Sequence, residues 1–298
     1  MPRKILEKKL QKILAEDLGQ GDVTTALVVP EGCVVEAEVI AKEPGVVAGI
    51  EEARVLLESQ ELKVDTLVAD GEKIKPKQTL MKILGDAQTI FATERTLLNI
   101  LSRMSGIATV TRKLVEKLRK AGLKAKVACT RKTAPGLLYF DKKAVLIGGG
   151  DVHRLHLDDM VLIKDNHITL AGGIEKAIKK AREKVSFSKK IEVEVAKIED
   201  VSVAAEVGVD IIMLDNFSPK QIKDAIKSLK KAGHFGRVLL EASGGITTEN
   251  IVEFASTGVD IVSLGEITHS PEALDISLEI KKPSRAKRAS GLNTIREG

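Results

Sequence analysis

Six short apolar runs, each ending in a polar residue, constrain this chain more than any other feature of its sequence. The runs are rich in Val and Ile, which is typical of buried strands in a parallel sheet. They occupy residues 126–132, 160–164, 191–195, 210–215, 238–243 and 261–266. When such strands close into a barrel, their carboxyl ends carry the active site, so the polar ends of the runs predict one shared site.

The part of the chain that holds these runs alternates strand and helix. Helical patterns lie between the strands at residues 172–184, 198–207, 219–232 and 248–256. This rhythm predicts parallel strands joined by right-handed crossovers. Because only six strands are clear, where a closed barrel of this kind has eight, we expect an open, incomplete α/β barrel over residues 111–270.

Residues 1–110 do not follow the same rhythm. A helical pattern comes first, the stretch from Cys33 to Lys42 alternates like a strand, and two further strands flank the turn dipeptide Asp70-Gly71. A long helical pattern then runs from Ala87 to about Ala121, with a break expected at Gly106. We therefore expect an N-terminal α+β sandwich domain, an α/β fold class for the whole chain, and two domains in all.

The last part of the chain, residues 271–298, is expected to be helical at first, around Leu274 to Ile280, and to pack back on the N-terminal domain. The chain has 47 Lys and Arg against 42 Asp and Glu, a net charge of +5, and much of the excess lies in residues 281–288. There is no Trp, one Tyr and six Phe, so few rings could stack on bases. We expect a solvated basic tail and no nucleic-acid partner.

Compartment and membrane contact are also predicted from composition. The two cysteines, Cys33 and Cys129, lack metal-type spacing and fit a reducing, cytoplasmic setting. The first 16 residues are charged throughout, and no apolar run approaches the ~20 residues that a membrane span needs. We expect neither a signal peptide nor a membrane partner.

Cations follow the first run. Thr130-Arg131-Lys132 places two of them at its end, and Arg can grip a carboxylate or phosphate with two hydrogen bonds, whereas Lys acts as a point charge. Three glycines at 148–150 let backbone approach a ligand, and His153-Arg154 adds donors just after them. Solvated loop charges on a flexible linker are the alternative.

Lys164 ends the second run, and an unpaired ammonium is costly to bury, so a function is favoured there. Two functions compete. Lys164 could form a Schiff base, as in a lyase, if its pKa were depressed, or it could stay charged and hold an anion. The neighbouring cations favour an anion site, although they would also lower the pKa of Lys164.

Acids end the third and fourth runs. Glu192 and Glu194 share one face of their strand, Glu194 being nearer the carboxyl end, and Asp215 ends the next strand. Acids among so many cations could bind sugar hydroxyls, coordinate Mg²⁺ or stabilise a developing positive charge. Salt bridges that balance the lysines are the alternative.

Small residues end the fifth and sixth runs. Ser243-Gly244-Gly245 opens a helix, and Gly265-Glu266 is followed closely by His269. Glycine-rich turns at the last strands of a barrel commonly present backbone N–H groups to a phosphate. The strand ends together predict a site for an anionic substrate and a phosphate.

Taken together, these segments resemble the quinolinate phosphoribosyltransferase family. The matching stretches run in order along nearly the whole chain and are 16–25, 94–99, 105–109, 130–133, 148–154, 162–167, 192–195, 214–216, 241–246 and 268–270. The resemblance implies an N-terminal α/β sandwich and an open barrel that is usually described as seven-stranded. It also implies a homodimer with shared active sites, which some members assemble into hexamers.

The resemblance further implies a reaction and a set of roles. Quinolinate and phosphoribosyl pyrophosphate would react with Mg²⁺ to give nicotinate mononucleotide, pyrophosphate and CO₂ in NAD biosynthesis. Arg131, Arg154 and Lys164 would hold the two carboxylates, with His153 and with Arg95 of the other subunit.

The remaining roles concern the phosphoribosyl group. Lys132 would reach pyrophosphate or a carboxylate, and Glu194 and Asp215 would face the ribose directly or through Mg²⁺. Lys132, Lys164, Glu194 and Asp215 are the expected catalytic set. The ribose phosphate would lie against the residues of the two glycine-rich turns, which are Ser243, Gly244, Gly245, Gly265, Glu266 and His269, and Thr130 would line the same site.

One departure is visible, because His156 stands where family members often have Gly. Three other hypotheses stay open: a Schiff-base lyase using Lys164, a nucleic-acid binder using the basic tail, and a paralogue associated with molybdate operons that uses another acceptor.

Overall fold

The structure is a computed structural model that describes residues 1–281, and these form two compact units. One unit consists of Met1–Gly106 together with residues 272–281, and the other is Ile107–Pro271. The division falls inside helix α4 (Ala87–Lys120), whereas the sequence pattern had suggested a boundary after residue 110.

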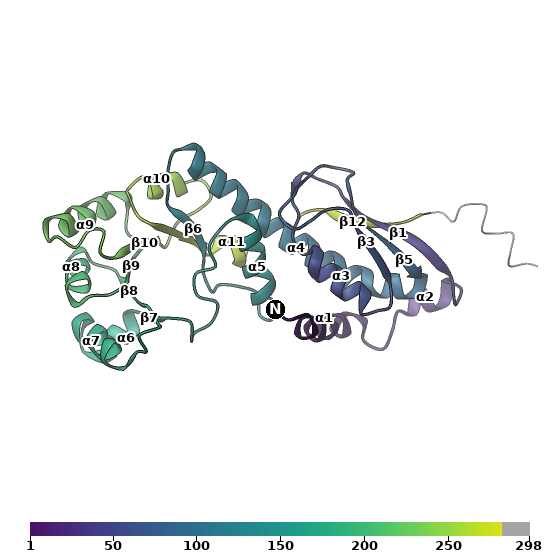
Figure 1. Cartoon of the computed structure of the whole chain (residues 1–298), viewed down its shortest axis with the longest axis horizontal. Helices are drawn as coiled ribbons and strands as arrows, with labels where there is room; N and C mark the ends of the chain where they lie inside the picture. The colour runs from purple at the N-terminus through teal and green to yellow at the C-terminus, as the bar shows by residue number, and fades with distance from the viewer. Residues whose placement is uncertain (282–298) are drawn as a thin grey trace, which may run out of the picture. The chain divides into compact units, whose positions relative to one another are not determined.

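The N-terminal unit is built on a four-stranded antiparallel sheet in the order β12-β1-β5-β3, with a separate β2-β4 pair (Figure 1). Its elements are α1 (Arg3–Leu18), α2 (Val23–Val28), β1 (Val34–Ala41), β2 (Gly45–Val46), α3 (Ile50–Glu58), β3 (Lys63–Thr66), β4 (Lys73–Ile74), β5 (Thr79–Asp86) and β12 (Ile276–Lys281). The expected α+β domain is thus present, with helices beside one antiparallel sheet.

The helix expected over residues 274–280 is wrong, because this segment is strand β12. It pairs antiparallel with β1, Ala41 lying opposite Ile276 and Glu36 opposite Lys281. Apolar residues alternate along it with Ser277 and Glu279, which is the two-residue period of a strand. The edge of β1 provides the partner with which this strand pairs. The chain after the barrel does return to the N-terminal sheet, while residues 282–298, most of the basic tail, lie outside the described residues.

The break expected at Gly106 is also wrong, since α4 runs through this residue without interruption. A Cβ added to Gly106 would lie 1.9 Å from the carbonyl oxygen of Glu272. The glycine therefore allows the backbone of residue 272 to approach the helix closely, and it does not end the helix.

The C-terminal unit holds six parallel strands in the order β6-β11-β10-β9-β8-β7 (Figure 1). They are β6 (Lys126–Cys129), β7 (Val161–Ile163), β8 (Ile191–Val195), β9 (Ile211–Asp215), β10 (Leu239–Ser243) and β11 (Ile261–Leu264). Strands β6 and β7 are the two edges, and Asp151 adds one isolated parallel bridge to Ala128 of β6. The sheet matches the expected open α/β barrel, with six strands and that single bridge in place of about seven strands.

A helix follows each strand. The helices are α5 (Leu138–Gly148), α6 (Asp165–Ala171), α7 (Ile174–Lys184), α8 (Ile198–Val207), α9 (Pro219–Lys231), α10 (Ile251–Ala255) and α11 (Glu266–His269). Helices α7 to α9 lie on the outer side of the curved sheet (Figure 1), whereas the short α11 lies at the carboxyl end of β11, beside a cavity. Helix α9 shows how the sequence specifies them: Ser218 and Gln221 form a capping box, and Ile222, Ile226 and Leu229 are buried at helical spacing.

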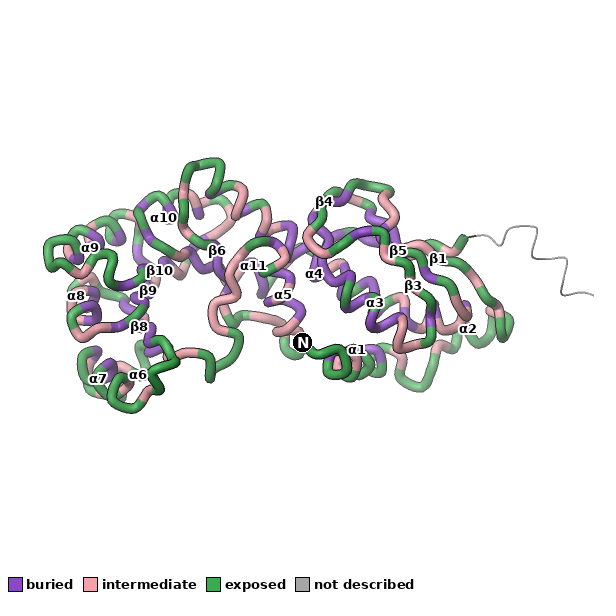
Figure 2. The backbone as a smooth tube through the Cα atoms, in the orientation of Figure 1, coloured by how far each residue is buried: buried purple, intermediate pink, exposed green. Residues whose placement is uncertain are grey.

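The central strands are buried on both faces, and they carry two buried glutamates, Glu192 and Glu241, among their apolar residues. Four of the five residues of β8 and of β9 are buried, as the purple segments at the sheet show in Figure 2. The register also aligns the carboxyl ends of neighbouring strands, Ser243 lying opposite Asp215 and Leu264 opposite Cys129. Within residues 1–281, none of the helices combines the length and the apolar character that crossing a membrane requires.

Candidate active site

A cavity of about 930 Å³ lies at the carboxyl ends of the six strands. It is lined by every candidate residue of the C-terminal unit, namely Thr130, Arg131, Lys132, His153, Arg154, Lys164, Glu194, Asp215, Ser243, Gly244, Gly245, Gly265, Glu266 and His269. Arg95 is exposed on α4 of the N-terminal unit and does not line this cavity. The strand ends thus gather into one site, although the runs that end there are far apart in sequence.

The arginines form the most positive part of the wall. Arg131 follows β6, Arg154 follows the glycine loop, and both also line a smaller adjoining cavity with Lys164 and Lys189. Burial, and then the positive charge of Arg131, lower the pKa of Arg154. Since like charges held together are stabilised by a bound anion, this wall suits a carboxylate or phosphate ligand.

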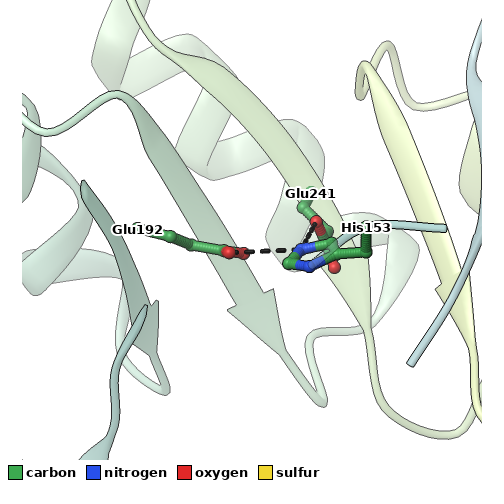
Figure 3. Close-up of side chains that lie close together, drawn as sticks. All are labelled: His153, Glu192 and Glu241. Atoms are coloured by element: carbon green, nitrogen blue, oxygen red, sulfur yellow. Dashed lines mark hydrogen bonds and ion pairs between the residues drawn. The ribbon is translucent and has the colours of Figure 1, made fainter. Parts of the chain in front are cut away.

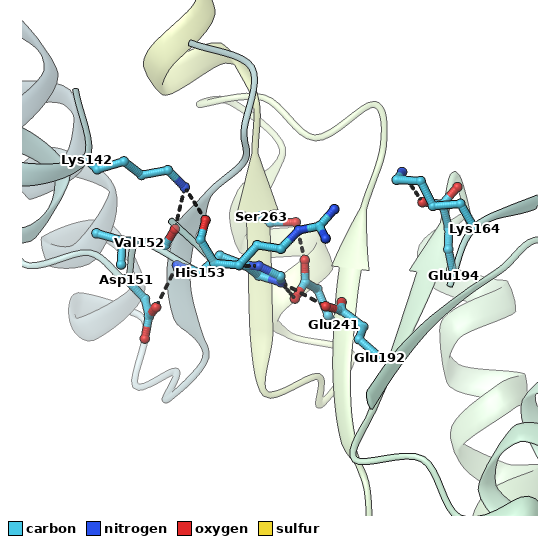
Figure 4. Close-up of polar contacts among 10 residues, drawn as sticks. Lys142, Asp151, Val152, His153, Lys164, Glu192, Glu194, Glu241 and Ser263 are labelled. Atoms are coloured by element: carbon cyan, nitrogen blue, oxygen red, sulfur yellow. Dashed lines mark hydrogen bonds and ion pairs between the residues drawn. The ribbon is translucent and has the colours of Figure 1, made fainter. Parts of the chain in front are cut away.

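Lys164 follows β7, and its Nζ lies 2.6 Å from Oε2 of Glu194 on β8 (Figure 4). The side chain of Lys164 is thus engaged with a carboxylate at the cavity wall. The backbone N–H of Lys164 donates to Nδ1 of His167 at 3.0 Å, so His167 caps the start of α6. The sequence had suggested no role for His167.

Asp215 ends β9 beside Glu194. Burial and the negative charge of Glu194 raise the pKa of Asp215, and the hydrogen bond from Asn216 and the charges of Lys164 and Lys132 only partly offset this. Nδ2 of Asn216 donates to Oδ2 of Asp215 at 2.8 Å. Asp215 is therefore only partly compensated by positive charge, and the carboxylate oxygens of Asp215 and Glu194 are the donors that Mg²⁺ prefers.

The glycine turn after β10 is shaped by close packing. Gly244 and Gly245 have φ angles of 87° and 64°, the left-handed region that favours glycine. A Cβ on Gly244 would lie 2.4 Å from Oδ1 of Asn216. Asn250 fastens the turn, since Nδ2 donates to the Gly245 carbonyl at 3.0 Å and Oδ1 accepts the Thr247 N–H at 2.8 Å.

Two functional candidates were missed by the sequence reasoning. Glu192 had been noted only for sharing a face with Glu194, and Glu241 only as part of a strand and a matching stretch. Both are fully buried, and an Oε2 of each lies 3.1 Å from Nε2 of His153 (Figure 3). A signal was present, because a glutamate inside an otherwise apolar run is costly unless a partner meets it.

His156, the visible departure from the family pattern, lies in an exposed turn. The backbone N–H groups of Leu155 and His156 both donate to Oδ2 of Asp159, at 2.5 Å and 3.0 Å. His156 is not among the residues that line the cavity. The histidine therefore alters a turn beside the site and leaves the cation set in place.

Two family models match the chain. Residues 22–105 match the quinolinate phosphoribosyl transferase N-terminal domain, and residues 107–279 match the C-terminal domain. Among curated relatives, a probable nicotinate-nucleotide pyrophosphorylase [carboxylating] of Archaeoglobus fulgidus is 49% identical over 246 residues, covering 83% of this chain and 94% of that protein. A protein of the same description from Methanothermobacter thermautotrophicus is 43% identical over 272 residues, covering 91% of this chain and 98% of that protein.

A solved structure agrees with these matches. The nicotinate-nucleotide pyrophosphorylase from Francisella tularensis superposes with a TM-score of 0.86 at 37% identity, covering 94% of this chain and 98% of that chain. Both halves of the chain, the fold and the residues at the strand ends thus lead to one assignment. The chain belongs to the quinolinate phosphoribosyltransferase family.

Proposed function

We propose that the cavity joins quinolinate to phosphoribosyl pyrophosphate and releases pyrophosphate and CO₂, giving nicotinate mononucleotide for NAD biosynthesis. The observation that carries this proposal is the order of charge around the sheet. Cations lie at the ends of the edge strands β6 and β7, the glycine turns follow β11 and β10, and acids end β9 and β8. This order matches a dicarboxylate, a phosphate and a ribose placed side by side.

The dicarboxylate would lie against the cationic wall. Arg131 and Arg154 offer forked donors that suit carboxylates, and Lys164 adds a third cation from the opposite edge of the sheet. Lys132 lies next to Gly265, whose added Cβ would be 3.0 Å from its Cδ, so its ammonium could reach a pyrophosphate between the two substrates. Arg95 would complete the site from the other subunit of a homodimer.

The phosphoribosyl group would lie over the glycine turns and the acids. Ser243, Gly244 and Gly265 would hold the 5-phosphate through the turn geometry that lets backbone approach it, with His269 and Gly245 beside them. Glu266 lines the cavity, and within residues 1–281 its buried Oε2 has no hydrogen-bond partner, which suits a ligand hydroxyl.

Glu194 and Asp215 fit a magnesium ion. Their carboxylates are the oxygen donors that the ion prefers, and the raised pKa of Asp215 marks a place where added positive charge is favourable. Bound Mg²⁺ would neutralise charge on the pyrophosphate as it leaves. The carboxylates of Glu194 and Asp215 would also stabilise the positive charge that develops on the ribose.

The remaining chemistry belongs to the substrate. The ring nitrogen attacks C1 of the ribose as the bond from C1 to the pyrophosphate oxygen breaks. When the 2-carboxylate departs as CO₂, its electron pair stays on C2 beside the cationic ring nitrogen, and C2 then takes a proton from solvent to give nicotinate mononucleotide. Arg131 and Arg154 would orient the ring for this attack. No amine nucleophile is needed, which agrees with Lys164 being ion-paired to Glu194. We also propose a cytoplasmic enzyme, a dimer or a hexamer, without a nucleic-acid partner.

The test is turnover of the purified protein with quinolinate, phosphoribosyl pyrophosphate and Mg²⁺. We expect one pyrophosphate, one CO₂ and one nicotinate mononucleotide per quinolinate consumed. Turnover with another acceptor and none with quinolinate would favour the paralogue and contradict the proposal. A borohydride-trapped adduct on Lys164 would favour the lyase.

A further inference from the structure

The segment that carries His153 and Arg154 is held by buried charged groups that have no role in the proposed reaction, and one of them, Glu241, reaches the cavity wall. His153 has a φ of 52°, a left-handed conformation that is uncommon for a residue with a side chain. Such a conformation persists only where the surroundings impose it. The contacts around the segment show what imposes it.

The ring of His153 is anchored through both of its nitrogens. Nε2 lies 3.1 Å from an oxygen of Glu192 and 3.1 Å from an oxygen of Glu241, and Nδ1 accepts the backbone N–H of Arg154 at 2.8 Å (Figure 3). Oγ of Ser263 donates to the other oxygen of Glu241 at 2.6 Å. With both nitrogens in contact, the ring links the glutamates of β8 and β10 to the backbone of Arg154.

The backbone on either side of His153 is anchored from α5. Lys142, which is 1% exposed, donates from Nζ to the carbonyl oxygens of Val152 and Arg154, the second at 3.2 Å (Figure 4). Oδ1 of Asp151 accepts the N–H of His153 at 2.9 Å. Three consecutive peptide groups are thus tied to side chains.

Burial and the neighbouring charges act on the pKa values of Lys142, His153 and Glu192 in this cluster. Burial lowers the pKa of Lys142 and raises the pKa of Glu192, as expected for charged groups away from water. Burial acts to lower the pKa of His153, whereas its contacts with Glu192 and Glu241 and their negative charges act to raise it. Because Nδ1 accepts the N–H of Arg154, the ring proton lies on Nε2, which faces the carboxylates of Glu192 and Glu241.

Stability alone does not account for such an arrangement. Apolar side chains of similar volume are often at least as stabilising as buried ionic groups, because the ions must give up their hydration. What the ionic cluster supplies is directionality, since hydrogen bonds fix the segment in one geometry. Arg154, at the end of that segment, lines the cavity and lies close enough to Arg131 for the two charges to interact.

We propose that Lys142, Glu192 and Glu241 are positioning residues that hold the His153–Arg154 segment so that Arg154 meets a substrate carboxylate. His153 acts as the link between the buried acids and this segment. The proposal rests on the assignment of the cationic wall to quinolinate. It adds to the site three residues that would act on the substrate through His153 and Arg154.

The test compares steady-state KM values for the two substrates in paired variants. Glu192→Leu and Glu241→Leu remove the carboxylates that lie against Nε2 of His153. Glu192→Gln keeps a polar side chain of the same shape, and Lys142→Met removes the anchor from α5. We expect the Leu and Met variants to raise KM for quinolinate at least tenfold and to change KM for phosphoribosyl pyrophosphate less than twofold. Glu192→Gln should have a KM for quinolinate much closer to the wild-type value than Glu192→Leu has. The exposed Glu175→Gln, remote from the cavity, is the control.

Coupling to Arg154 separates positioning from general damage to the fold. In an Arg154→Ala background, Glu241→Leu should weaken quinolinate binding, measured by calorimetry, less than twofold further. Equal rises in both KM values, or full additivity with Arg154→Ala, would overturn the proposal. If a Leu variant does not fold, Ser263→Ala, which removes one hydrogen bond to Glu241, should still raise the quinolinate KM selectively by about twofold to fivefold, and an unchanged KM would refute it. Wild-type turnover of quinolinate tests the proposed function separately.

Discussion

A paired substitution at the turn after β10 tests how the structure builds its phosphate-binding end. Gly244→Ala adds a Cβ that would lie 2.4 Å from Oδ1 and 2.8 Å from the backbone nitrogen of Asn216. Gly245→Ala adds the same atom one residue later, where no atom lies within 4 Å. Both glycines have positive φ angles, 87° and 64°, so the pair differs mainly in the clash.

The two costs can be estimated separately. Placing a side chain in the left-handed region costs about 1–2 kcal/mol, and this applies to both variants. Forcing an extra carbon into a packed site adds about 1–3 kcal/mol, and this applies to Gly244→Ala alone, because a backbone atom cannot rotate away as a side chain can. We therefore expect Gly244→Ala to lower the free energy of unfolding by about 2–5 kcal/mol and Gly245→Ala by about 1–2 kcal/mol.

Urea unfolding followed by tyrosine fluorescence measures the free energy of unfolding of the two variants in the C-terminal unit, which holds the turn. The chain has no Trp and one Tyr, Tyr139, which lies in the C-terminal unit with the turn. Because Asn216 hydrogen-bonds Asp215, displacement of Asn216 should also raise KM for phosphoribosyl pyrophosphate in Gly244→Ala. Equal loss of stability in the two variants would refute the packing argument.

Three further predictions concern other parts of the molecule. Asp215→Asn should raise the melting temperature at pH 7 while abolishing turnover, because the pKa of Asp215 is raised in the folded state and its ionised form destabilises the fold above that pKa. In scanning calorimetry this gain should vanish as pH falls below the ordinary pKa of 3.8, and a gain that persists there would contradict the argument. Gly106→Ala should destabilise the N-terminal unit, because its Cβ would lie 1.9 Å from the carbonyl oxygen of Glu272. Circular dichroism during thermal unfolding checks this, and an unchanged melting temperature would contradict it. If Arg95 acts across a dimer, mixing inactive Arg95→Ala and Lys164→Ala subunits should restore partial activity, and verified heterodimers without activity would count against shared sites.

The barrel could be predicted from the sequence because its strands are local signals. Runs such as Ile211–Asp215 are short, apolar and bounded by turns, and each became a strand with its polar residue at the cavity. The predicted family, fold class and reaction class are confirmed by the family models and relatives. The roles of individual site residues and the magnesium ion remain predictions.

What the sequence did not predict depends on partners far away in the chain. The segment Ile276–Lys281 is a strand because the edge of β1, more than 200 residues earlier, is there to pair with it. Gly106 is compatible with a helix because the backbone of Glu272 packs against it. Glu192 and Glu241 acquire a role only because the barrel brings His153 between them, a meeting that no local pattern encodes.

The most direct test of the account is a pair of structures of this protein, one with quinolinate bound and one with phosphoribosyl pyrophosphate and Mg²⁺. We predict that the quinolinate carboxylates contact Arg131, Arg154 and Lys164, and that the 5-phosphate lies on the turn at 243–245. A 5-phosphate bound by Arg131 and Arg154, or quinolinate lying on the glycine turn, would contradict the order of groups around the barrel.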